Sequence, residues 1–155
     1  MRVIAGRARG MKLKVPKGQP VRPTADRVKE ALFSIIGPRV AGARVLDLFA
    51  GSGALGIEAL SRGAELAVFV DVNRHCLATI RENLQRARLE EQAILVAGDA
   101  RRVLPRLAQE GHRFDLIFID PPYGQGLAEE VLRLLEGTDL LEPGGLVVVE
   151  TGSRE

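Results

Sequence analysis

From residue 44 onward, short apolar runs alternate along the chain with stretches of helical periodicity. The runs are Val45–Phe49, Leu66–Val70, Ala93–Ala97, Leu116–Ile119 and Leu146–Val149. Helices are expected between them, at about 53–61, 73–88, 100–110 and 126–136. Apolar and polar residues do not alternate within the runs, which is typical of strands covered on both faces. The pattern predicts an α/β fold: a doubly wound, mostly parallel, Rossmann-like sheet with right-handed crossovers and the order 3-2-1-4-5.

The length and composition point to an ordinary globular protein. With 155 residues, 46% of them hydrophobic and 27% charged, we expect a single domain over residues 1–155. One Cys excludes a disulfide framework, and two His do not favour a metal site, so no metal is expected. No apolar run is long enough for a membrane span, and the N-terminus has no signal-peptide core. We therefore expect a cytoplasmic monomer that does not bind membranes.

The formal net charge of +2 hides a strong asymmetry. Residues 1–29 contain nine Lys or Arg and one acid, a charge of +8, whereas the other 126 residues carry 13 basic and 19 acidic residues, a charge of −6. Clustered basic residues attract a polyanion and release its counterions. Residues 1–23 are predicted to form a basic N-terminal hairpin, because 2–5 and 12–15 partly alternate and Gly6 and Gly10 lie between. This arm either binds a phosphate backbone or is a solvated extension.

A helix is expected directly after this arm. Thr24 is a plausible N-cap, Asp26 would lie in the first turn, and Gly37-Pro38 would end the helix. The apolar residues that follow Thr24 at helical spacing are Val28, Ala31, Leu32, Ile35 and Ile36.

Ligands of doubly wound sheets bind at the carboxyl ends of the strands, beside the point where the strand order reverses. Directly after the first strand the chain has a G-x-G-x-x-G pattern at Gly51, Gly53 and Gly56, which permits a tight turn and close approach of a ligand. Asp71 ends the second strand, where an acid can bond ribose hydroxyls. The alternative is a tight turn followed by an acidic strand end.

Asp47 and Asp99 carry further information about the ligand. Asp47 is a charged residue inside an apolar strand, where a carboxylate costs free energy unless it is paired. It would repel the pyrophosphate of NAD but attract the ammonium and sulfonium of S-adenosylmethionine (SAM); the alternative is that it caps backbone amides. Asp99 follows the third strand and can hold an adenine amino group or N-cap the helix that begins near Ala100.

The fourth strand ends in Asp120-Pro121-Pro122-Tyr123. Asp120 can accept a hydrogen bond from an exocyclic amine, and Pro121 stiffens the turn and has no N–H. A neighbouring carbonyl can accept the second amine hydrogen, so that the nitrogen lone pair points at a methyl donor. Tyr123, the only Tyr of a chain without Trp, offers a stacking face for a base. The alternative is a plain turn.

These motifs resemble a known family. Asp47-Leu-Phe-Ala-Gly-Ser-Gly53, Asp71, Gly98-Asp99-Ala100 and Asp120–Tyr123 together look like class I SAM-dependent methyltransferases that act on exocyclic amines. The stretches that narrow the resemblance to the bacterial RsmD-type enzymes are Arg2–Gly10, Arg22–Phe33 and Glu142–Gly145. The resemblance implies direct methyl transfer from SAM to the N2 amine of a guanine, guanine-966, in 16S rRNA. The partner would be 16S rRNA, the 30S subunit or an assembly intermediate, with the base turned out of its stack.

The resemblance also implies roles for individual residues. The cofactor-binding residues would be Asp47, Phe49, Gly51, Ser52, Gly53, Asp71, Val72, Asp99, Ala100 and Asp120. The residues that hold the target base would be Asp120, Pro121, Pro122 and Tyr123. The RNA-binding residues would be Arg2, Arg7, Arg9, Lys12, Lys14, Arg22 and Thr24. Whether Asp120 also takes the proton of the amine is open at this stage.

Three other functions are compatible with parts of this pattern. A DNA adenine-N6 methyltransferase can use the same Asp-Pro-Pro-Tyr motif, although 155 residues leave no room for a target-recognition domain. An NAD-binding oxidoreductase or nucleotide-binding module would use the glycine loop, but Asp47 argues against it. An RNA-binding protein without activity would use only the basic arm.

The class I methyltransferase fold ordinarily continues into a C-terminal antiparallel hairpin, so without one we expect 146–150 to be an apolar edge strand.

Overall fold

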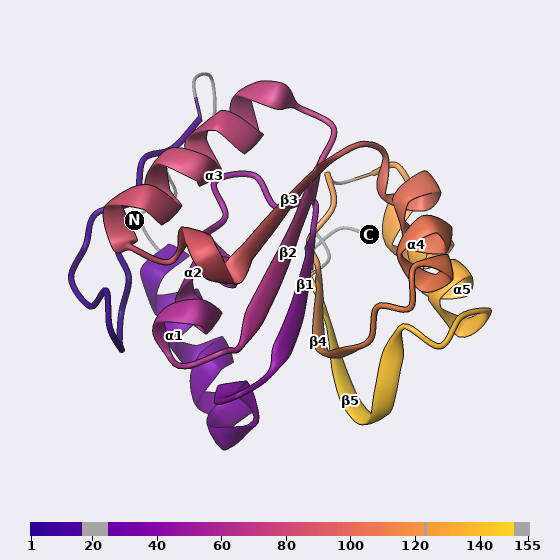
Figure 1. Cartoon of the computed structure of the whole chain (residues 1–155), viewed down its shortest axis with the longest axis horizontal. Coiled ribbons are helices and arrows are strands. Elements are labelled where there is room, and N and C mark those ends of the chain that lie inside the picture. The colour runs from indigo at the N-terminus through magenta and orange to yellow at the C-terminus, as the bar shows by residue number, and fades with distance from the viewer. Residues whose placement is uncertain (17–24, 123, 151–155) are drawn as a thin grey trace.

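The computed structural model describes residues 1–16, 25–122 and 124–150, and it contains one five-stranded parallel sheet in the order β3-β2-β1-β4-β5 (Figure 1). The strands are β1 Arg44–Leu48, β2 Leu66–Asp71, β3 Ala93–Ala97, β4 Phe114–Ile119 and β5 Leu141–Val149. The helices are α1 Ala25–Ile36, α2 Ala54–Ser61, α3 Arg74–Ala87, α4 Ala100–Gln109 and α5 Leu127–Glu136, with short 3-10 turns η1 Gly37–Val40 and η2 Glu90–Gln92. The predicted Rossmann-like fold and strand order are confirmed.

The helices cover both faces of the sheet, as the continuous apolar runs predict. Helices α1, α2 and α3 lie on one side, and α4 and α5 lie on the other (Figure 1). Because side chains of a strand alternate between faces, Val45 packs toward the first group of helices and Leu46 toward the second. The sheet therefore separates two apolar cores, and polar side chains can reach solvent at the strand ends. In the part of the chain described here, no helix is long and apolar enough to cross a bilayer.

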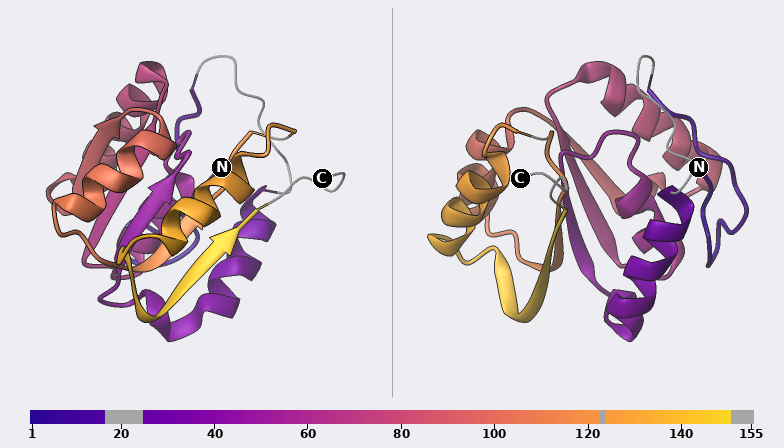
Figure 2. Two further views of the ribbon diagram at one scale, coloured as in Figure 1. Left: turned by 90° about the vertical axis from the view of Figure 1, so that its right-hand side faces the viewer. Right: turned by 180° about the vertical axis from the view of Figure 1, so that it is seen from behind.

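The last strand is longer than predicted. It begins at Leu141, opposite Phe114, and its pairing with β4 shifts register before resuming at Leu146 opposite Leu116. The shift accommodates the Pro143-Gly144-Gly145 turn, in which Gly144 has a φ of +79°. The prediction placed the strand at 146–149 because this turn interrupts the apolar run. Among the described residues β5 is an edge strand of the sheet (Figure 2, left).

Helix α1 begins and ends close to its predicted boundaries, and its buried face combines apolar residues with a lysine. Lys29, Phe33 and Ile36 are buried, whereas Val28 and Ile35 remain 54% and 83% exposed. Of the five apolar residues at helical spacing, Val28, Ala31 and Ile35 are exposed, because the packed face of α1 includes the buried cation Lys29. The predicted N-cap, Thr24, lies outside the described residues.

The N-terminal segment, residues 1–16, packs against the domain. Its two halves meet through an antiparallel bridge between Arg2 and Lys12, with hydrogen bonds from Val3 N to Met11 O (2.9 Å) and from Leu13 N to Met1 O (2.9 Å). The predicted hairpin is thus a single bridge rather than two strands. At its turn Gly6 has a φ of +87°, and a Cβ there would lie 1.8 Å from the carbonyl oxygen of Ser61. Only glycine lets the segment approach α2 so closely.

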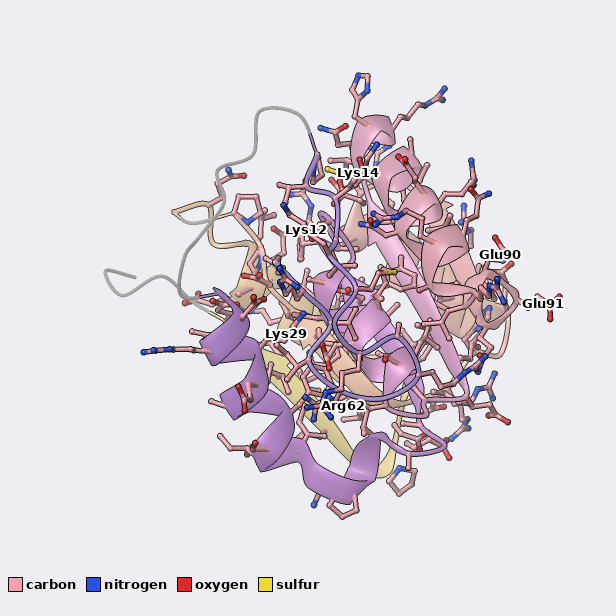
Figure 3. All side chains as sticks on the ribbon, turned by 90° about the vertical axis from the view of Figure 1, so that its left-hand side faces the viewer. Lys12, Lys14, Lys29, Arg62, Glu90 and Glu91 are labelled. Carbon is pink, nitrogen blue, oxygen red and sulfur yellow. The ribbon has the colours of Figure 1, made fainter. Side chains whose placement is uncertain are left out.

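Glu58 of α2 anchors this segment. Its fully buried carboxylate accepts hydrogen bonds from the amides of Ile4 (2.9 Å) and Ala5 (3.1 Å). It also pairs with Lys29 Nζ at 3.2 Å and Arg62 Nε at 2.8 Å, and both cations lie beside the segment in Figure 3. Two cations and two amides compensate the cost of burying the carboxylate. The Lys29 pKa is lowered by burial, although the neighbouring Glu58 opposes that shift.

The third glycine of the loop motif sets how closely α2 packs on the sheet. A Cβ on Gly56 would lie 2.3 Å from Cε1 of Phe69 in β2. We predict that Gly56→Ala destabilises the protein by about 1–3 kcal/mol, the usual cost of overpacking a core. Urea unfolding followed by circular dichroism measures this.

Gly137→Ala is the matched control, because there the nearest atom to an added Cβ is the Leu134 carbonyl oxygen at 3.6 Å. This variant should unfold within about 1 kcal/mol of the native protein. Equal stability of the two variants would contradict the close packing of α2 on β2.

Candidate active site

The carboxyl ends of the strands gather most of the predicted site residues at one edge of the sheet. The last paired residue of β1, Leu48, lies opposite Val70 of β2 and Ile119 of β4. The residues one position further, Phe49, Asp71 and Asp120, therefore emerge at the same level. Because β1 lies between β2 and β4, this edge is the point where the strand order reverses.

Asp71 holds the glycine loop in place. Its carboxylate accepts hydrogen bonds from Gly51 N at 2.9 Å and from Asn73 N at 2.8 Å. Its carbonyl oxygen accepts the amide of Gly98, at the end of β3, at 3.0 Å. One residue thus joins the loops after β1, β2 and β3. A carboxylate has about four lone-pair positions, so it can still accept hydrogen bonds from ligand hydroxyls.

The loop itself depends on backbone conformations that glycine adopts easily. Gly51 and Gly53 have φ values of +58° and +81°. Phe49 has a φ of +59°, which is strained for a bulky residue and is found mostly at functional sites. Ser52 lies between the two glycines and is partly exposed. The predicted tight turn is therefore present.

Asp47 is buried beneath this loop in an unfavourable electrostatic environment. Its side chain is 2% exposed and accepts a hydrogen bond from Gly56 N at 3.1 Å. Burial raises the pKa of Asp47 well above its usual range, and the negative charges of Asp120 and Asp71 raise it further. Of the two roles considered for Asp47, the structure contains the amide cap, while attraction of the SAM cation stays a prediction.

Asp99 is the N-cap of α4. It accepts the Arg101 amide at 2.9 Å, and it forms an ion pair with the Arg101 guanidinium at 2.6 Å. These contacts hold the Asp99 pKa at about 2. Of the two roles considered for Asp99, the structure contains the cap, while contact with adenine stays a prediction. Val72, after Asp71, is 68% exposed, whereas Ala100 is buried. Of these two predicted cofactor-binding residues, Val72 is therefore the one that presents an apolar side chain to solvent.

The Asp-Pro-Pro segment follows β4 directly. Asp120 is partly exposed, Pro121 is buried and Pro122 is exposed. Tyr123 lies outside the described residues, as do Arg22 and Thr24. Asp120 raises the pKa of Asp47, as expected because Asp47 lies in β1 and Asp120 directly follows the neighbouring strand β4. In the described part of the chain, no cluster of three or more His, Cys, Asp and Glu side chains is arranged to hold a metal ion.

The predicted RNA-binding cations lie on the surface of the N-terminal segment. Arg2, Arg7, Arg9, Lys12 and Lys14 are all exposed. Arg7 contacts Gln92 at 3.1 Å, and Lys14 pairs with Glu82 of α3 at 2.8 Å. Sequence reasoning missed Arg86 of α3, which lines a shallow surface groove together with Lys12 and Lys14. Its position on an exposed helix face gave no signal that the N-terminal segment would lie alongside.

The sheet order and the glycine loop at its reversal point define a protein with the fold of class I methyltransferases, and comparison with known proteins agrees. Residues 1–155 match the family model described as "Conserved hypothetical protein 95", and the chain belongs to this family. The predicted resemblance to the RsmD-type enzymes is confirmed by two relatives. "Putative rRNA methyltransferase YlbH" of Bacillus subtilis is 45% identical over 150 residues, which cover 97% of this chain and 82% of that protein. "Ribosomal RNA small subunit methyltransferase D" of Escherichia coli is 43% identical over 155 residues, 97% of this chain and 74% of that protein.

Solved structures carry the same fold. "Putative methyltransferase yhhF from Escherichia coli" has a TM-score of 0.87 and 40% identity, and the match covers 100% of this chain and 84% of that one. A hypothetical protein of Thermus thermophilus also has a TM-score of 0.87, with 37% identity over 100% of this chain and 88% of that one.

The buried state of Asp47 has a consequence for stability. A carboxyl whose pKa is raised on folding binds protons more tightly in the folded state, so the free energy of unfolding falls as pH rises from about 3.8 through the raised pKa. We predict that Asp47→Asn reduces this fall and makes the protein more stable than the native chain at pH 8. An asparagine oxygen can still accept the Gly56 amide. Urea unfolding at pH 5 and pH 8 measures the effect.

Asp139→Asn is the control, because Asp139 is exposed on the loop before β5. Its pH dependence should equal that of the native chain. If Asp47→Asn is less stable than the native protein at pH 8, Asp47 is not the strained carboxylate described above.

Proposed function

We propose that this protein transfers a methyl group from SAM to the exocyclic N2 amine of a guanine in 16S rRNA. The observation that carries the proposal is the arrangement at the reversal point of the sheet. There the glycine loop, held by Asp71, lies one strand away from the Asp-Pro-Pro segment, with Asp47 buried between neighbouring strands. Similarity to small-subunit rRNA methyltransferases supports the choice of substrate.

The charges at this edge suit SAM. Asp47 interacts with the like charges of Asp71 and Asp120, so the ammonium of a bound methionine moiety would relieve this repulsion. Asp71 can accept the ribose hydroxyls, and exposed Val72 offers an apolar surface for the adenine. NAD would bring a pyrophosphate to the same loop and increase the repulsion. We infer that the cofactor is SAM.

The reaction needs positioning more than proton transfer. The amine nitrogen attacks the SAM methyl carbon, the N–C bond forms as the C–S bond breaks, and S-adenosylhomocysteine (SAH) leaves. Alignment of the two reactants can lower the activation free energy by about 7–11 kcal/mol. Asp120 orients the amine by accepting one of its hydrogens, and Pro121 adds no competing donor. After transfer the nitrogen loses a proton, to Asp120 or to water.

The N-terminal segment would bind the RNA. Its exposed cations can contact phosphates without reading sequence, which fixes the protein on its substrate while the pocket selects the base. The target guanine must be unstacked and turned into the pocket, with Tyr123 as its proposed stacking partner. We propose guanine-966 as the target base, as the resemblance to the RsmD-type enzymes implies. Small ribosomal subunits are made in the bacterial cytoplasm, where we expect the protein to act.

The proposal is tested by offering methyl-labelled SAM with naked 16S rRNA, 30S subunits and duplex DNA. We expect label in the ribosomal substrates and none in DNA. We predict that Asp120→Ala lowers transfer at least about 100-fold, because an unoriented amine loses its alignment, while calorimetry shows a much smaller loss of SAM affinity, because Asp47 and Asp71 remain.

Label in DNA alone would instead indicate an adenine methyltransferase. Native activity in Asp120→Ala would remove Asp120 from the proposed mechanism. Calorimetry with NAD is the control for the cofactor, and binding of NAD without binding of SAM would overturn the proposal.

The proposed RNA surface makes its own prediction. Replacing Arg9 and Lys12 together by Gln removes two exposed cations, so the slope of log K against log salt for 16S rRNA should decrease by about 2. Arg133→Gln on α5, on the opposite face of the sheet, is the matched control and should leave the slope unchanged. Fluorescence anisotropy across a salt series measures both. Equal slopes for all three proteins would contradict an RNA surface on the N-terminal segment.

A further inference from the structure

Asn83 of α3 connects the N-terminal segment with the glycine loop. Its side chain is fully buried, and its amide makes three hydrogen bonds to backbone groups. Two go to Lys14: Oδ1 accepts from Lys14 N at 2.9 Å, and Nδ2 donates to Lys14 O at 3.0 Å. The third runs from Nδ2 to the carbonyl oxygen of Ser52 at 3.2 Å. Both hydrogens of the amide group are therefore used.

On the segment side, Asn83 replaces a strand partner. It bonds both the N–H and the C=O of Lys14, as a neighbouring strand would. The Lys14 side chain is left at the surface, where it pairs with Glu82 at 2.8 Å. This contact fixes the backbone beside exposed Lys12 and Lys14, two of the proposed phosphate contacts. Loss of the amide would leave part-buried backbone groups of Lys14 and Ser52 without this partner, which is costly.

On the other side, α3 contacts the glycine loop at Ser52 and Gly53. Ser52 lies between Gly51 and Gly53, and its carbonyl accepts the Asn83 amide. One helical turn earlier on α3, Ile80 packs against Gly53, where an added Cβ would lie 3.0 Å from Ile80 Cγ1. One face of α3 thus fixes both the packing and the hydrogen bonding of the loop.

We infer that Asn83 is a positioning residue that couples RNA binding by the N-terminal segment to cofactor binding by the glycine loop. The inference rests on the proposed function, because that function assigns these ligands to the two elements. A ligand that restrains either element restrains the other through the three hydrogen bonds of the Asn83 amide, so the second ligand binds at a smaller cost in conformational entropy. By linkage, RNA must then raise cofactor affinity by the same factor as the cofactor raises RNA affinity.

The coupling is measured as the ratio of two dissociation constants for SAH, the one without RNA divided by the one with saturating RNA. Isothermal titration calorimetry gives the SAH affinity of the full chain alone and with saturating 16S rRNA; SAH is used because it cannot react. We expect RNA to tighten SAH binding at least about 5-fold in the native protein. Asn83→Ala should bring this ratio close to 1.

A second pair of variants tests the same contact without changing Asn83. Lys14→Pro removes the amide hydrogen that Asn83 accepts, whereas Lys14→Gln keeps it, and both variants lose the lysine charge. We expect the ratio to fall in Lys14→Pro and to remain near native in Lys14→Gln. Val131→Ala, in the core between α5 and the opposite face of the sheet, controls for a general loss of stability and should keep the native ratio.

The outcomes separate the inference from the function on which it rests. A native ratio near 1, or a native ratio that persists in Asn83→Ala and in Lys14→Pro, overturns the coupling alone. Absence of SAH binding to the native chain overturns the proposed function as well. If Asn83→Ala does not fold, the comparison of Lys14→Pro with Lys14→Gln decides.

Discussion

The hydrogen bonds that Asp71 forms at the end of β2 are the constraint on which the site depends. Parallel pairing brings the ends of β1, β2 and β4 to one level, but it does not give the chain after β1 a fixed path. The Asp71 carboxylate does so by accepting the Gly51 amide at 2.9 Å, and its carbonyl holds the start of the loop after β3. The glycine turn with its positive φ values is thus tied to β2 through the amide of Gly51.

Two buried carboxylates on the same face of the sheet show how structural and functional charges differ. Glu58 is surrounded by two cations and two backbone amides, and it fastens the N-terminal segment to α2. Asp47 accepts the Gly56 amide but faces the negative charges of Asp71 and Asp120. A buried charge among like charges costs folding free energy, which is a reason to connect it with a ligand. A cationic cofactor would supply the missing compensation.

Much of the fold and of the candidate site could be predicted from the sequence, because strands buried on both faces and glycine turns have strong local signatures. The strand order, the glycine loop and the positions of Asp71 and Asp120 at strand ends all follow from such patterns. Lys29, Glu58 and Asn83 could not be predicted, since each looks like an ordinary polar residue of an exposed helix face. All three side chains bond the backbone of the N-terminal segment, and these contacts join residues far apart in the sequence.

We propose that this chain methylates a guanine of the small-subunit rRNA, and nucleoside mass spectrometry of that rRNA tests this most directly. Cells in which the gene is deleted should have 16S rRNA with less N2-methylguanosine than cells that carry it. A plasmid copy of the native gene should restore the modified nucleoside. An unchanged content of N2-methylguanosine in the deleted strain, with all other nucleosides equal, would contradict the account.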